Sequence, residues 1–192
     1  MESPQRTLNR FSQFLTRIQK LKIAREIIRG NHATNEEATK GVRLSSEANR
    51  LMCALAPYPD QQRAVATYIF KITRDLTTLT QSVDRFNERF TKIKCELQKG
   101  PGVDPAKDAQ TKAELCTTAQ GFVSEVVDPS MIAVMDNIEA ALKAFTTVRE
   151  QLRALGVQGS QDFGRRWFVE VDESASMIEG HTDDWETFLS SK

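Results

Sequence analysis

The amino-acid sequence predicts an all-α fold, an elongated antiparallel bundle of helices. Its clearest support is an apolar stripe whose members follow one another at alternating steps of four and three, the spacing of one helix face. The members are Val65, Ile69, Ile72, Leu76, Leu79, Val83, Phe86, Phe90, Ile93 and Leu97. Near the C-terminus Trp167, Val169 and Val171 alternate as in a strand. No second strand is visible to pair with them, so we expect helix there as well.

The stripe predicts one long helix over about 60–99. Asp60 is a natural N-cap directly after a proline, and Gly100-Pro101-Gly102 is a strong stop signal. The helix would be roughly 60 Å long at 1.5 Å per residue. Its 3.5-residue repeat is typical of packing along the full length, within the chain or against a partner in a coiled coil. We favour packing within the chain, because the flanking positions are uncharged where a zipper usually has Glu and Lys. These positions are Ala66, Tyr68, Thr73, Thr80 and Ser82.

A second long helical segment is expected over about 105–156. Asp104 and Pro105 open it as N-cap and first residue. Asp128-Pro129 interrupts its apolar face, and the absence of glycine there favours a kink over a reversal. The sequence leaves open whether one kinked helix or two helices result. Because the preceding loop is short, this segment must return antiparallel to the 60–99 helix.

Two amphipathic helices are expected before this pair, at 4–29 and 34–56. Thr34 and Glu37 form a capping box that opens the second of them. With the two long segments they complete a bundle, and we therefore predict a bundle domain over residues 1–159.

Residues 160–192 are predicted to form a separate segment, acidic and rich in aromatic side chains, that is docked on the bundle or trails from it. Helical spacing runs through its first part, Gly180 is expected to break that helix, and Thr182 to cap a short terminal piece.

The charges of the two ends are opposite. The chain has 26 basic and 26 acidic residues, but residues 1–30 have seven basic and two acidic side chains, and residues 160–192 have three basic and eight acidic ones. The N-terminal helix is a candidate surface for a membrane or a partner, through Arg10, Phe11, Phe14, Arg17, Lys20, Lys22 and Arg25. Candidate docking residues at the C-terminal end are Trp167, Phe168, Trp185 and Phe188. We hypothesise that the acidic segment braces the basic helix; alternatively, that helix buries its apolar face in the core and leaves its arginines in solvent.

No pattern of catalytic residues is present. The sequence lacks HExxH, GxSxG and a glycine-rich phosphate loop, and Asp162-Phe163-Gly164 matches the kinase tripeptide without any other kinase motif. His32 and His181 are the only histidines, and the three cysteines are dispersed along helices, where we expect them to pack as small apolar residues. We therefore predict no enzyme, no cofactor, no metal site and no small-molecule substrate.

The pattern of charges and the number of cysteines bear on nucleic-acid binding and on cellular location. Acidic residues interleave with the basic ones near the end of the 60–99 helix, so nucleic acid is not an expected partner. An odd number of cysteines without a CxxC pair, and no long apolar run, indicate a reducing cytoplasmic location, with peripheral membrane association as an extension of it.

The plan of four helices followed by C-terminal helical pieces is similar to the amino-terminal bundle and brace of mixed-lineage-kinase-like cell-death executioners and their fungal relatives. The resemblance lies in the layout of the helices and assigns no role to any residue. Our leading hypothesis is a non-enzymatic interaction protein, that is, an adaptor, an assembly subunit or an oligomerising module, with a protein partner or a second copy. The alternative is a membrane-associating or lipid-binding bundle of cell-death-executioner type, acting through the basic N-terminal helix on an anionic surface.

If the stripe forms the core, placing a carboxylate in it should unfold the protein. We expect Leu79→Asp and Phe86→Asp to abolish the cooperative thermal transition, because a charge cannot be buried there unpaired. Arg17→Ala should keep the transition near that of the wild type. Circular dichroism melts would check this, and similar melting temperatures for all three variants would contradict it.

Overall fold

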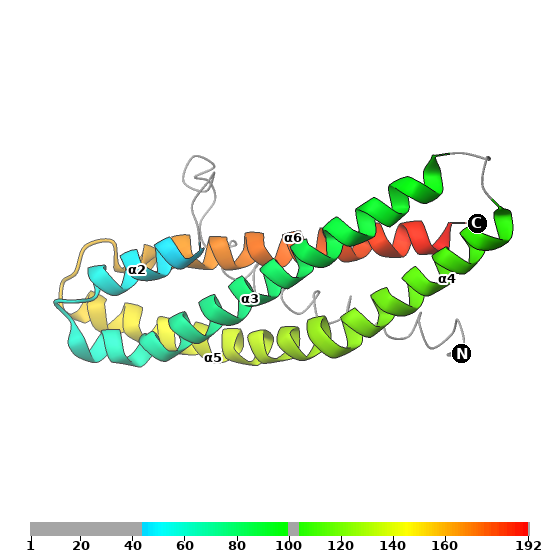
Figure 1. Cartoon of the computed structure of the whole chain (residues 1–192). Helices are drawn as coiled ribbons and strands as arrows, with labels where there is room; N and C mark the ends of the chain where they lie inside the picture. The colour runs from blue at the N-terminus through cyan, green and yellow to red at the C-terminus, as the bar shows by residue number, and fades with distance from the viewer. Residues whose placement is uncertain (1–43, 100–103, 192) are drawn as a thin grey trace.

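The computed structural model describes residues 44–99 and 104–191. This part of the chain is helical and contains no strand, so the all-α bundle is confirmed. Its elements, shown in Figure 1, are α2 (Leu44–Ala54), α3 (Pro59–Gln98), α4 (Pro105–Phe122), a π-helical turn (Val123–Val127), α5 (Asp128–Ala154), a 3₁₀ turn (Ser160–Asp162) and α6 (Arg165–Ser190). The predicted helix at 4–29 and the first part of that at 34–56 lie outside the described residues.

Helix α3 is the spine of the bundle, with bounds within one residue of those expected. Stripe residues from Val65 to Val83 are buried, and so is Phe90. Phe86, Ile93 and Leu97 are half-buried, near the end where α3 and α4 diverge in Figure 1. The stripe therefore faces the chain's own core over most of its length.

Helices α4 and α5 form one continuous path through Asp128-Pro129. The five residues of the π turn widen the backbone before the proline, and the amide of Asp128 donates to the carbonyl of Val123, five residues back. A proline removes one backbone donor and crowds the carbonyl four residues before it. The wider turn absorbs that disruption, as π-bulges do, so the chain bends without stopping. Figure 1 shows α5 returning alongside α3.

Helix α6 is a single helix, and the predicted break at Gly180 is wrong. The hydroxyl of Thr182 donates to the carbonyls of Ile178 and Glu179 within the helix, so it does not cap a new one. Ile178 and Trp185, on either side of the glycine, are fully buried. Their burial outweighs the cost of about 1 kcal/mol that glycine imposes on a helix interior.

Two tryptophans attach α6 to α3. The indole Nε1 of Trp167 donates to Thr73 Oγ1, and that of Trp185 donates to Asn87 Oδ1, each over 2.9 Å. Both contacts advance in the same direction along both helices, so α6 runs parallel to α3, as Figure 1 shows.

Two glycines make different demands on the fold, although both lie in or beside α6. Gly164 has φ +83°, and a Cβ there would lie 2.4 Å from Cε1 of the Phe145 ring. Gly180 is helical, and a Cβ added to it would meet no atom of a neighbouring element within 4 Å.

We expect Gly164→Ala to destabilise the protein by roughly 2 kcal/mol or more, through left-handed strain and the clash with Phe145. The matched variant Gly180→Ala should stabilise it by about 0.5–1 kcal/mol, because alanine favours a helix interior. Urea unfolding of both variants would measure this. Equal effects of the same sign would contradict the backbone geometry assigned to α6.

Candidate interaction surface

Phe70 is the most exposed aromatic side chain that the structure describes, with 51% of its surface accessible. It follows Ile69 on α3, about 100° around the helix from the buried stripe, and its exposure shows that it lies on the solvent side of α3. Single exposed apolar residues are common on proteins, so Phe70 gains meaning only from what surrounds it.

A groove of about 320 Å³ lies beside Phe70, between α2 and α3. It is lined by Ser45, Ala48, Asn49, Phe70, Thr73, Arg74, Thr77 and Thr78. Apart from Phe70 and Arg74 these side chains are short and uncharged. Thr73 is buried and accepts the hydrogen bond of Trp167, so α6 fixes this part of the groove from behind.

Arg74 is held in place on the groove wall. Its Nε and Nη2 atoms each donate to Asp75 Oδ1 over 3.0 Å, and its side chain is largely exposed. The groove thus presents an aromatic ring and an oriented guanidinium, two side-chain types enriched at the centres of protein interfaces.

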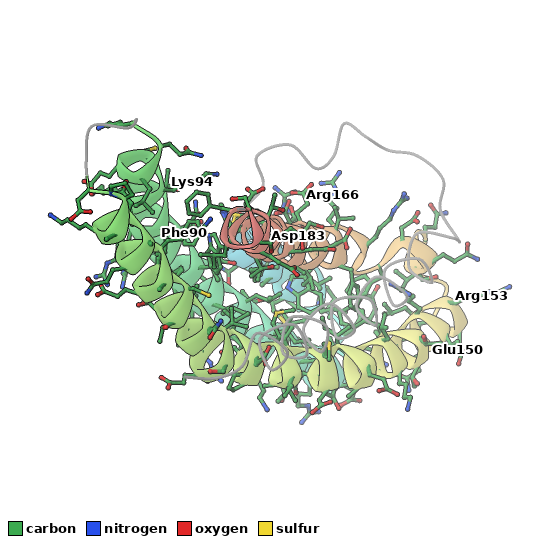
Figure 2. All side chains as sticks on the ribbon, turned by 90° about the vertical axis from the view of Figure 1, so that its right-hand side faces the viewer. Phe90, Lys94, Glu150, Arg153, Arg166 and Asp183 are labelled. Atoms are coloured by element: carbon green, nitrogen blue, oxygen red, sulfur yellow. The ribbon has the colours of Figure 1, made fainter. Side chains whose placement is uncertain are left out.

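The opposite side of α2 faces a pocket of about 440 Å³ at the beginning of α6. Helix α2 contributes Glu47, Arg50, Leu51 and Ala54, which share one helix face. The other wall is formed by the chain between Gly159 and Val169, including the exposed Arg166 labelled in Figure 2. Helix α2 therefore separates a groove toward α3 from a pocket toward α6.

Two acidic residues, Glu47 of α2 and Glu170 of α6, are largely shielded from solvent. Glu47 is 4% exposed, and its Oε1 atom is 3.1 Å from Nη1 of the largely exposed Arg50, an ion pair without hydrogen-bond geometry. Glu170 is 6% exposed. Burial raises the pKa of Glu170 to about 7, and the charges of Glu173 and Glu47 act in the same direction.

The C-terminal docking candidates all contact the described bundle. Trp167 and Phe168 pack on Phe145 of α5, with ring centroids 5.8 and 4.9 Å away. Trp185 meets the Phe86 ring of α3 at 4.8 Å.

Phe188 closes the far end of the bundle. Its ring lies 5.8 Å from that of Phe90, and the Nζ atoms of Lys94 and Lys112 lie 5.4 and 5.3 Å from its centroid. Lys112 also donates to the carbonyl of Ser191. The last turn of α6 is therefore held between α3 and α4, where Figure 2 shows Phe90 and Lys94 beside the end of that helix.

The candidate surface of the N-terminal helix, from Arg10 to Arg25, lies outside the described residues. Its membrane or partner role, and its bracing by the acidic segment, stay predictions. Within the described ranges no helix is long and apolar enough to cross a membrane.

The titratable side chains show no assembled site in the described part of the chain. No group of three metal-binding side chains occurs there. His181 Nε2 lies 3.5 Å from Asp84 Oδ1, and its ring stacks on Trp185. Contrary to expectation, Cys53 and Cys95 are exposed and only Cys116 is half-buried, because the first two point off the buried faces of their helices.

Sequence reasoning missed Phe70, Glu47, Glu170 and the two polar partners Thr73 and Asn87. The sequence did not separate Phe70 from Thr73, because each directly follows a stripe residue and lies about 100° around the helix from it, yet only Thr73 is buried. Thr73 and Asn87 carried no signal, because their role depends on which side of α3 receives α6.

The Trp185–Asn87 hydrogen bond can be tested by a double-mutant cycle. Asn87→Leu should cost about 1–3 kcal/mol, because it leaves a buried indole N–H unpaired. In the Trp185→Phe background the same change should cost less, since no N–H remains. Urea unfolding of the four proteins gives the coupling energy, and a value of zero would exclude this bond.

Comparison with protein-family models, with curated proteins and with solved structures found no match to this chain. The function proposed below therefore rests on the residues of the chain itself.

Proposed function

We propose that the chain is a non-enzymatic protein-interaction module, such as an adaptor, an assembly subunit or an oligomerising module, and that the α2–α3 groove is its contact surface. Its occupant is a helix of a partner protein that packs an apolar side chain on Phe70 and places a carboxylate near Arg74. The observation that carries this proposal is the exposure of Phe70 at the rim of a groove.

The shape of the groove favours a helix. Its walls are two helices whose facing side chains are short, including Ser45, Ala48 and Thr77. Helix axes pack 8–10 Å apart, closest where the contacting side chains are small. A third helix can therefore lie in this groove and bury Phe70 without displacing α2 or α3.

The energetic centre of such a contact would be Phe70, since aromatic residues surrounded by nearly neutral contacts give the largest losses on truncation. Arg74 would add orientation more than affinity, because Asp75 already engages its guanidinium and the side chain is exposed to solvent. The threonine and serine side chains would exclude water around the ring.

The experiment compares two exposed apolar residues on different faces of the bundle. Phe70→Ser should lower the amount of a specific partner retained from native lysate by tenfold or more. Ile132→Ser on α5, 40% exposed in the wild type, is the matched control and should retain it. Titration with the purified partner, followed by circular dichroism, would show whether a helical segment binds.

Two outcomes would redirect the proposal. If the wild type shows a concentration-dependent mass by light scattering that Phe70→Ser abolishes, the occupant is a second copy. If both variants bind every partner as the wild type does, the groove is not the contact surface. Salt-sensitive co-sedimentation of the full chain with anionic liposomes would then favour the lipid-binding alternative through residues such as Arg17.

A further inference from the structure

The pocket between α2 and the beginning of α6 has the size of a small-molecule site. Its volume of about 440 Å³ lies within the range of roughly 300–1,000 Å³ that is typical of ligand pockets. Leu51, Phe163 and Val169 give it apolar surface, and three arginine residues also line it. Ligand pockets commonly combine an apolar lining with a few polar groups that orient the ligand.

The charged side chains that line this pocket leave a positive charge without a counterpart. They are Arg50, Arg165, Arg166, Glu47 and Asp162. Arg50 pairs with Glu47 at 3.1 Å, and Arg165 lies 3.8 Å from Asp162. Arg166 is exposed and makes no ion pair within the described ranges of the chain. An anionic group in the pocket would therefore meet an unpaired guanidinium.

The backbone at the start of α6 adds hydrogen-bond donors to the same wall. The amide of Phe168 donates to the carbonyl of Gly164, so the amides of the three residues between them precede the first helical hydrogen bond. Gly164 is the N-cap and has no side chain that could accept from them. Such amides, with the positive end of the helix dipole, attract anions. An uncapped helix end is common, and this one gains meaning because it borders a pocket that also holds the unpaired Arg166.

Contacts with α5 hold the wall that precedes α6 in place. Arg149 Nε donates to the carbonyl of Phe163 over 2.9 Å, and the rings of Phe163 and Phe145 stack with their centroids 6.4 Å apart. Gly164 lies so close to Phe145 that a Cβ there would clash with the ring. The pocket is therefore largely preformed, which lowers the entropy lost when a ligand binds.

We propose that this pocket binds a small amphiphilic anion, that is, a phosphate monoester or a carboxylate on an apolar body. The anionic head lies between Arg166 and the first amides of α6, and the apolar body lies against Leu51 and Val169. The lining of this pocket shares no residue with that of the α2–α3 groove. The proposal therefore does not rest on the proposed function.

Titration calorimetry of the full chain with octyl phosphate, dissolved below its micelle concentration, tests the site. The wild type should bind one molecule per chain. Arg166→Gln should weaken binding by about tenfold, since it removes a charged donor from the anionic head. Arg153→Gln removes an exposed positive charge from the end of α5, labelled in Figure 2, and is the matched control that should bind as the wild type does.

Further probes separate the head from the body and identify the source of the ligand. Octanol lacks the head and inorganic phosphate lacks the body, so each should bind about tenfold more weakly than octyl phosphate, or weaker still. Phosphatidylcholine vesicles with and without phosphatidate present the same head at a membrane. Binding to phosphatidate vesicles that Arg166→Gln removes would identify a membrane lipid as the ligand, and binding of dissolved octyl phosphate alone would identify a soluble molecule.

The proposal is overturned if neither octyl phosphate nor the phosphatidate vesicles bind saturably, or if Arg166→Gln binds them as tightly as the wild type. Equal binding of octanol, or of inorganic phosphate, would also overturn it, because only one half of the ligand would then be recognised. Circular dichroism melts should be the same for Arg166→Gln and the wild type, since this side chain is exposed. Phe70→Ser should leave octyl phosphate binding unchanged, which separates a failure of this site from a failure of the proposed function.

Discussion

The structure depends on the attachment of α6 to α3 by Trp167 and Trp185. Trp167 is 1% exposed and Trp185 is 0% exposed. The N–H group of each indole, its only polar group, donates a hydrogen bond to a polar residue of α3, Thr73 or Asn87. Burying two such rings contributes several kcal/mol, but only if both N–H groups find acceptors. The two bonds fix the register of α6, and through it the wall behind the groove.

Much of the fold was predictable because its elements are bounded by local signals. The apolar stripe, Asp104 with Pro105, and the glycines after α3 and α5 act over a few residues, and the structure follows them closely. The bend near Pro129 was predictable as well, whereas the π turn that permits it was not, since its extra residue has no distinctive side-chain pattern. Gly180 failed as a stop signal because burial of the residues around it outweighs a local propensity.

The candidate site was much less predictable than the fold. The tryptophans were identified as docking residues from composition and charge, but their hydrogen-bond acceptors lie about 95 residues earlier in the chain. In the sequence Glu47 and Glu170 look like ordinary surface acids, yet both residues are buried in the structure. Residues such as these acquire their properties from tertiary contacts, and no spacing rule in a single sequence reveals such contacts.

Tryptophan fluorescence tests the central claim most directly, because Trp167 and Trp185 are the only tryptophans in the chain. If α6 is built into the core, native emission should be blue-shifted relative to that of the urea-unfolded protein, and acrylamide should quench it far less. Native emission and quenching equal to those of the unfolded chain would show a trailing C-terminal segment, and the attachment of α6 to α3 would be wrong.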